Sequence, residues 1–119
     1  MNIRLARESD VLSIGLIERD SFADPWGPSE FVSALNAPHT IFLVAQDADG
    51  VVEGYAIAMA VADEAEILNL AVHPRFRGKG IGGSLLDAAL AAVKSRGAAQ
   101  IYLEVRESND AARSGSFGQ

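Results

Sequence analysis

Residues 70–84 have the sequence LAVHPRFRGKGIGGS, in which an apolar segment leads into a loop of glycines and cations. Helical spacing of apolar residues begins at Ile81, so the pattern predicts a strand, a loop and the start of a helix. The N–H groups of a helix's first turn have no acceptors within the helix, and glycines allow a phosphate to approach them closely. The pattern therefore predicts a site for a cofactor that carries a pyrophosphate.

The spacing of these glycines leaves a second cofactor class open. Gly78, Gly80 and Gly83 also fit the dinucleotide pattern G-x-G-x-x-G, and Glu104 lies about where a ribose-binding acid would follow. That pattern usually turns directly after its strand, whereas residues 73–77 intervene here. The phosphate-binding pattern G-x-x-x-x-G-K-[ST] does not occur in the sequence. A dinucleotide-binding protein is therefore a distant alternative.

The composition predicts one globular domain over residues 1–119. Hydrophobic residues make up 49% of the chain and charged residues 22%, which is typical of a folded protein. The lack of cysteine excludes disulfides, thiolate metal sites and a cysteine nucleophile, and two histidines disfavour a histidine-rich metal site. No apolar run is long enough to span a membrane, and the first residues are charged where a signal peptide is apolar. We therefore expect a cytoplasmic protein without a metal or a membrane partner.

The charges are distributed unevenly along the chain. The net charge of −6 disfavours a nucleic-acid binder. No lysine or arginine occurs between Arg19 and Arg75, and that span holds nine acids. Such a span attracts cationic partners, but acids also serve solubility alone. Both interpretations stay open at this point.

Apolar periodicity and turn residues divide the chain into short elements. We expect helices that begin after Asp10, near Phe31 and at Ile81, the last of which ends at Gly97. We expect strands at residues 2–6, 40–46, 51–62, 65–73 and 100–106, with a bulge at Gly54. The three middle strands predict an antiparallel meander, and the whole order predicts an α+β or mixed α/β fold.

Several segments resemble one enzyme family. Residues 77–82 match R/Q-x-x-G-x-G/A, the acetyl-CoA signature of the GNAT acetyltransferases. Residues 64–74, residues 103–112 and the pair Pro25-Trp26 also resemble this family at the matching places. The chain is most similar to the RimI-type branch, whose members acetylate the N-terminus of a small-subunit ribosomal protein. The likeness covers residues 1–113.

This resemblance implies a fold, an activity and a set of site residues. The fold would be the GNAT fold, a central, mostly antiparallel sheet flanked by helices. The activity would be transfer of acetyl from acetyl-CoA to an amine, namely the α-amino group of a protein N-terminus, with a basic acceptor sequence. Glu104 would be the general base that takes the proton of the amine, unless it is only an exposed strand glutamate. The implied cofactor-binding positions are Leu70, Ala71, Val72, Arg77, Gly78, Lys79, Gly80, Ile81, Gly82, Gly83 and Asn109.

The segment after Asn109 departs from the family pattern. The family has a tyrosine there, which protonates the departing coenzyme A thiolate, and then a C-terminal β-hairpin. The tyrosine position is Ser116 here, and a serine hydroxyl is a far weaker acid than a phenol. We therefore expect a truncated or frame-shifted C-terminus that lacks the hairpin. A second function stays open, a non-catalytic coenzyme A-binding remnant or an interaction module.

Three single residues carry further expectations. His73, before a proline, is predicted to be a loop residue. Trp26 is predicted either to form a wall of the acceptor site or to fill the core. Glu66 is predicted either to assist the acceptor amine or to be a solvated strand acid.

Overall fold

The computed structural model describes residues 1–106 of the chain. Its elements, in chain order, are β1 (Asn2–Leu5), η1 (Glu8–Asp10), α1 (Val11–Ser21), α2 (Pro28–Asn36), β2 (Thr40–Gln46), β3 (Val52–Val61), β4 (Glu64–Val72), η2 (Pro74–Phe76), α3 (Ile81–Ser95) and β5 (Gln100–Arg106). The strands that the sequence predicted are present, with ends that differ by about one residue.

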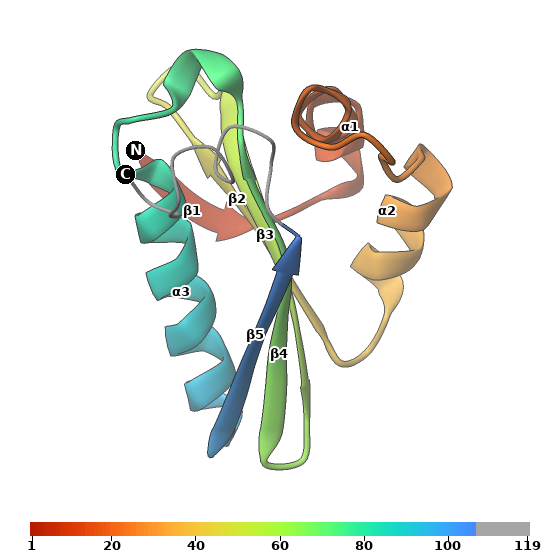
Figure 1. Ribbon diagram of the computed structural model, residues 1–119, viewed down its shortest axis with the longest axis vertical. Coiled ribbons are helices and arrows are strands. Elements are labelled where there is room, and N and C mark those ends of the chain that lie inside the picture. Colours follow the sequence, from red (N-terminus) through yellow and green to blue (C-terminus); the bar gives the residue numbers. More distant parts are fainter. Residues whose placement is uncertain (107–119) are drawn as a thin grey trace.

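The strands form one sheet in the order β1-β2-β3-β4-β5. Neighbours from β1 to β4 pair antiparallel, whereas β5 is parallel to β4 because α3 carries the chain back between them. Figure 1 shows α3 on one face of the sheet and α1 and α2 on the other. Each face has its own cluster of buried apolar side chains. The predicted mixed α/β fold with a mostly antiparallel sheet is confirmed.

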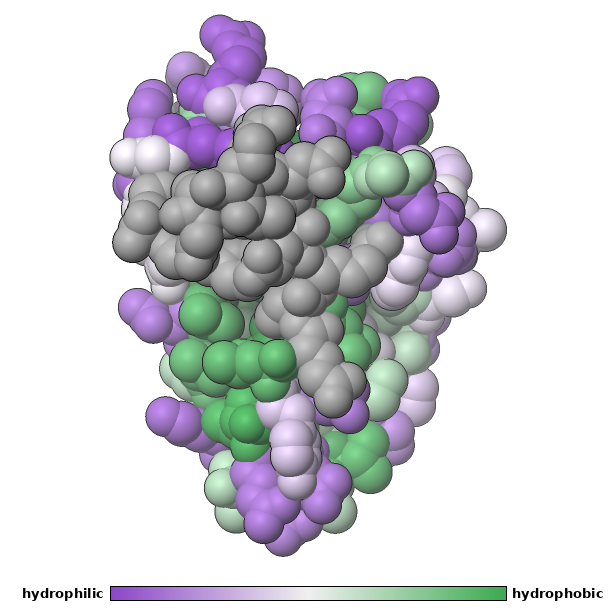
Figure 2. All heavy atoms as spheres, in the orientation of Figure 1, coloured by the Kyte–Doolittle hydropathy of each residue, from purple (hydrophilic) through white to green (hydrophobic). Residues whose placement is uncertain are grey.

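The sheet ends at β5 in the part of the chain that the structure describes. Two of its side chains are well exposed, Tyr102 at 44% and Leu103 at 60%. Figure 2 shows apolar atoms gathered over α3 and β5, whereas both ends of the molecule are polar. Among residues 1–106, no strand pairs with the outer edge of β5.

Gly54 marks the predicted bulge in β3. Ala45 pairs with Gly54 and Gln46 with Val52, so Glu53 is the surplus residue. A Cβ at Gly54 would lie 2.8 Å from the Ala71 carbonyl oxygen and 3.0 Å from Leu85 Cδ1. Glycine at this position therefore allows Leu85 of α3 and the Ala71 carbonyl of β4 to lie close to β3.

A second bulge lies in β4 at Leu68, and the sequence did not predict it. Ile57 of β3 pairs with Asn69, and the next residue, Ala58, pairs with Ile67. Leu68 is left without a partner on β3 in this ladder. Ile67 and Leu70 consequently both belong to the cluster under α3, although a regular strand would place them on opposite faces.

A largely buried ion pair fastens β1 to the start of α1. Arg4 donates from Nη1 to Asp10 Oδ2 at 2.8 Å and from Nη2 to Asp10 Oδ1 at 2.9 Å. The backbone N–H of Arg7 also donates to Asp10 Oδ2, at 2.7 Å. The Arg4 hydrogen bonds hold the pKa of the Asp10 carboxyl below its ordinary value, against the opposing effect of burial.

We expect Asp10→Asn to lower the free energy of unfolding by about 2 kcal/mol at pH 7, because the variant loses the charge that pairs with Arg4. The native carboxylate stabilises the fold above the ordinary aspartate pKa of about 3.9. That stability is lost as the pH falls through the lower folded-state pKa, so the difference between the two proteins should shrink there. Urea unfolding at pH 7 and at pH 3 measures it. An equal difference at both pH values would contradict this account.

Candidate functional site

The loop between β4 and α3 has the strand–loop–helix form that the sequence predicted. After Val72, the backbone N–H of Arg75 donates to His73 Nδ1 at 3.1 Å, and that of Phe76 donates to the His73 carbonyl at 2.9 Å. His73 thus caps the short helix η2, which agrees with its expected place in a loop. α3 then begins at Ile81, at the same end of the molecule as the carboxyl end of β4 (Figure 1).

Two glycines give this loop its conformation. Gly78 has a φ of +81° and Gly80 a φ of +80°, values that residues with a side chain rarely adopt. A Cβ at either position would meet no described atom within 4 Å. The space beside these glycines is therefore open to a ligand.

The first turn of α3 lies directly behind this open space. Its first hydrogen bond runs from the Ser84 N–H to the Gly80 carbonyl at 3.1 Å, so the N–H groups of Ile81, Gly82 and Gly83 have no acceptor within the helix. The positive end of the helix dipole adds to the attraction for anions. The loop and the first turn of α3 together fit a pyrophosphate.

Arg77 makes its described hydrogen bonds within the protein. Its Nε donates to the Val72 carbonyl at 2.9 Å, and its Nη2 donates to Ser21 Oγ at 3.0 Å. The side chain thus ties the end of β4 to the end of α1. The resemblance assigned Arg77 to the cofactor, and this assignment stays a prediction. Lys79 Nζ lies 5.7 Å from the centre of the Phe76 ring, within reach of a cation–π interaction.

The end of β4 extends beyond its pairing with β5. The last pair joins Asn69 to Arg106, and the next three residues, Leu70, Ala71 and Val72, pair with β3. Among residues 1–106, no strand pairs with these three on the β5 side. Leu70 and Ala71 are buried, with 2% and 3% exposure, and their side chains belong to the two core clusters, so the groups that face this edge are backbone groups.

The predicted base lies beside the bulge of β4. Glu104 follows Leu103, which pairs with Ile67, and precedes Arg106, which pairs with Asn69. Its backbone is therefore level with Leu68. Glu66, the other acid considered from the sequence, pairs with Tyr102 one step earlier and is half-buried. Asn109 and Ser116 lie outside the described residues.

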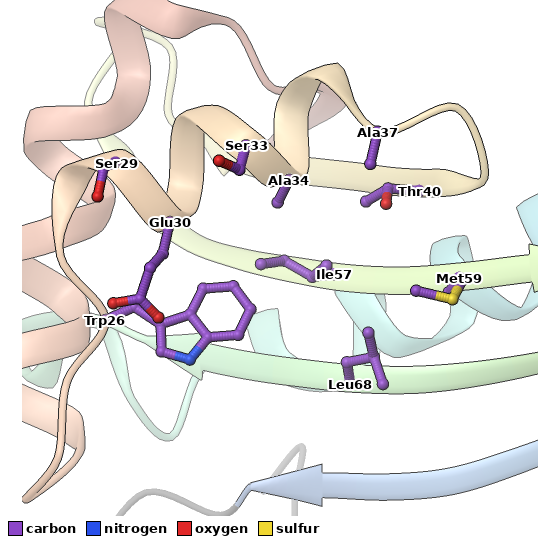
Figure 3. A pocket seen from close by; sticks show the side chains of 10 residues that line it. All are labelled: Trp26, Ser29, Glu30, Ser33, Ala34, Ala37, Thr40, Ile57, Met59 and Leu68. Atoms are coloured by element: carbon purple, nitrogen blue, oxygen red, sulfur yellow. The ribbon is translucent and has the colours of Figure 1, made fainter.

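A pocket of about 400 Å³ opens between α2 and the strands β3 and β4. It is lined mainly by apolar side chains, with a few polar groups, from Trp26, Ser29, Glu30, Ser33, Ala34, Ala37, Thr40, Ile57, Met59 and Leu68. Figure 3 shows the Trp26 indole beside the Glu30 carboxylate at one end, with Ile57, Met59 and Leu68 forming the floor.

Trp26 lies between the pocket and the core, and its role as a wall of the acceptor site stays a prediction. It lines the pocket, and its ring centre lies 5.5 Å from that of Phe31 in the core. Leu68 is a lining residue that sequence reasoning missed, because the surplus residue of a bulge leaves no mark on an apolar run. Leu68 immediately precedes Asn69 and the backbone edge of residues 70–72, so the pocket adjoins that edge.

The described residues contain no group of three or more histidine, cysteine, aspartate or glutamate side chains placed to hold a metal ion. They also contain no helix that is long and apolar enough to cross a membrane.

Comparison with known proteins bears directly on this site. Residues 11–114 match the model of the acetyltransferase (GNAT) family. The chain belongs to the GNAT family. It is 35% identical over 112 residues to a putative ribosomal protein bS18-alanine N-acetyltransferase of Bacillus subtilis, covering 93% of this chain and 74% of that protein. The chain spans only 64% of the length of the Escherichia coli K12 relative, with which it shares 36% identity.

Solved GNAT structures have the same fold. The ribosomal-protein-S18-alanine N-acetyltransferase of Escherichia coli superposes with a TM-score of 0.78 at 31% identity, over 95% of this chain and 72% of that one. The PaiA N-acetyltransferase of Thermoplasma acidophilum, solved in complex with coenzyme A, superposes with a TM-score of 0.78 over 96% of this chain and 84% of that one. Its identity of 22% supports the fold alone. As a GNAT member, the protein is an acetyl-CoA-dependent N-acetyltransferase.

Proposed function

We propose that the protein acetylates the α-amino group at the N-terminus of a basic protein. The observation that carries this proposal is the adjacency of two features on β4. The pocket that contains Leu68 adjoins the backbone edge of residues 70–72, which leads into the glycine loop. An amine in the pocket and a thioester along that edge would therefore meet. The names of the bS18-alanine N-acetyltransferase relatives support the choice of a protein N-terminus as acceptor.

The proposed cofactor contacts follow from the same geometry. The N–H groups of the first turn of α3 hold the pyrophosphate, and the open side of Gly78 and Gly80 admits it. The backbone of Leu70, Ala71 and Val72 aligns the pantetheine arm as an added strand would. Acetyl-CoA, when bound, supplies a thioester whose carbonyl carbon is attacked by the amine, while the carbon–sulfur bond breaks and coenzyme A leaves. Gly82, Gly83, Lys79, Arg77 and Asn109 remain predicted contacts.

The proposed role of Glu104 concerns the proton of the amine. A protein N-terminus has a pKa of about 7.7–8.0, so much of it is charged at neutral pH and cannot attack. A carboxylate at Glu104 accepts this proton, directly or through water. This role is supported by the position of the Glu104 backbone on β5, level with Leu68, which lines the pocket.

The acceptor is proposed to be basic because the residues that line the pocket include an acid and no cation. Glu30 lines it, and no lysine or arginine occurs between Arg19 and Arg75, a span that contributes all ten lining residues. Opposite charges speed the encounter and loosely retain a cationic peptide. The competing explanation, that these acids only keep the protein soluble, predicts no effect of peptide charge.

Competition between a basic and an acidic peptide of equal length and identical first residue separates these explanations. We expect the basic peptide to be acetylated about tenfold faster at low salt, since electrostatic steering changes association rates by that order or more. The preference should narrow at about 1 M salt, where the Debye length falls to about 3 Å. Mass spectrometry of the mixed products measures both rates. Equal use of the two peptides at low salt would contradict the basic-acceptor proposal.

A second function is favoured by Ser116, which stands where the family has its tyrosine acid. It is a non-catalytic coenzyme A-binding module. Calorimetry with acetyl-CoA, run beside an assay for thiol release with a basic peptide, distinguishes the two functions. Release that depends on a free N-terminus, tested with the same peptide carrying a blocked N-terminus, supports the acetyltransferase. Binding without release supports the module.

A further inference from the structure

A buried carboxyl group in α1 contacts the loop that forms one end of the pocket. The side chain of Glu18 is fully buried, at 0% exposure. Its Oε2 accepts the backbone N–H of Trp26 at 2.8 Å. Its Oε1 accepts the hydroxyl of Tyr55, which is itself fully buried in β3.

This placement is costly for a residue of this type. The rest of the buried face of α1 is largely apolar, with Val11, Ile14 and Ile17 packed into the core. A leucine at position 18 would continue that face without the free-energy cost of moving a carboxyl group out of water. The two hydrogen bonds offset this cost, and one of them satisfies a backbone donor of the loop between α1 and α2.

Trp26 is held from two sides by one circuit of contacts. Its backbone N–H is bound by Glu18, and its ring packs at 5.5 Å against Phe31. The Phe31 ring in turn meets the Tyr55 ring edge-on at 5.8 Å, with an interplanar angle of 82°. Tyr55 closes the circuit through its hydroxyl bond to Glu18. Neither the backbone nor the ring of Trp26 can shift without breaking a contact in this circuit.

We propose that Glu18 is a positioning residue that fixes the Trp26 wall of the pocket and thereby sets the affinity for the acceptor. The proposal rests on the proposed function, in which this pocket receives the acceptor. Glu18 acts through Trp26, which lines the pocket with Leu68 and Glu30. Three residues further along α1, Ser21 accepts the Arg77 bond that ties the helix to the end of β4. The final turn of α1 therefore holds the pocket wall in place relative to the strand beside the glycine loop.

Two substitutions at this position separate positioning from packing. Glu18→Leu keeps most of the volume and removes both acceptors. Glu18→Gln keeps an oxygen for the Trp26 N–H and presents an amide N–H to the Tyr55 hydroxyl oxygen, so it should behave like the native protein. Asp10→Asn is the matched control, because Asp10 is also a buried acid that accepts a backbone N–H but lies outside the pocket lining.

The KM for a basic peptide and the KM for acetyl-CoA are measured for each variant. We expect Glu18→Leu to raise the peptide KM by about tenfold, the factor that corresponds to one lost hydrogen bond, and to leave the acetyl-CoA KM unchanged. Glu18→Gln and Asp10→Asn should leave both values unchanged. A folded Glu18→Leu protein with a native peptide KM would overturn the proposal, as would an equal rise of both KM values.

Fluorescence supplies a readout that needs no activity. Trp26 is the only tryptophan of the chain, so quenching of its emission by acrylamide reports on this wall alone. Quenching should increase in Glu18→Leu and not in Glu18→Gln or Asp10→Asn. If the native protein releases no thiol with any peptide, the proposed function fails, and quenching alone decides on Glu18. Unchanged quenching in Glu18→Leu would then overturn the positioning role.

A third variant covers a failure of Glu18→Leu to fold, which circular dichroism would detect. Tyr55→Phe keeps the ring contact with Phe31 and removes only the hydroxyl that Glu18 accepts. A raised peptide KM with increased Trp26 quenching supports the circuit. Native values of both quantities in Tyr55→Phe would overturn it in that case.

Discussion

Replacing Gly80 with valine is expected to weaken coenzyme A binding by about a hundredfold, and more than any other single change in the loop. Two effects act together. The φ of +80° at this position strains a β-branched residue, and the new side chain would occupy the open space through which the pyrophosphate approaches. Isothermal titration with coenzyme A measures the affinity directly.

Gly50→Val is the matched control for this variant. Gly50 ends the turn between β2 and β3 with a φ of +86°, and a Cβ there would also meet no described atom within 4 Å. The two substitutions therefore impose similar backbone strain at different places. Coenzyme A affinity should stay native in Gly50→Val. An equal loss of affinity in both variants would assign the effect to strain and would contradict the phosphate cradle.

Glu104→Gln is expected to lower kcat by about a hundredfold at pH 7, which is the usual contribution of a general base. The affinity for coenzyme A should stay native, because the change lies outside the glycine loop. The deficit should shrink as the pH rises past about 8, where the acceptor amine is already neutral without help. A pH profile of peptide acetylation by both proteins measures this.

Glu64→Gln removes the same charge from an exposed position at the start of β4. Its pH profile should follow that of the native protein. If Glu104→Gln were as active as Glu64→Gln at pH 7, Glu104 would have no role as a base. A deficit in Glu104→Gln that stayed constant with pH would point to binding of the peptide and not to proton transfer.

Local signals in the sequence predicted the elements and the glycine loop. Asp49-Gly50 marks the turn between two strands, and Gly97 follows α3 with a φ of +96°. Each of these residues acts through its own backbone, so neighbours in sequence suffice to recognise it. The cofactor loop belongs to the same class, because its chemistry lies in consecutive residues.

The remaining features depend on contacts between distant residues. Ser21 and Arg77 are 56 positions apart, and Glu18 and Tyr55 are 37 positions apart. A role for Glu18 could not be predicted from the sequence, because a glutamate on an apolar helix face does not reveal which donors it meets in the fold. The pocket likewise forms only when α2 packs against β3 and β4. The pocket and these hydrogen bonds depend on how the helices pack on the sheet. Apolar periodicity predicts which face of an element is buried but not which residues meet there.

The bulge in β4 has two opposite effects. It interrupts the pairing of β4 with β3, and it supplies Leu68 to the pocket. Without Leu68, the residues Ile67, Asn69 and Leu70 would alternate regularly between the two faces. The cluster under α3 would keep its residues, and the opposite cluster would lose the contact of Leu68. The strand would be more evenly paired with β3, yet the pocket would lose part of its floor. A protein of this fold that lacked the surplus residue would therefore combine an uninterrupted β3–β4 ladder with a smaller apolar floor.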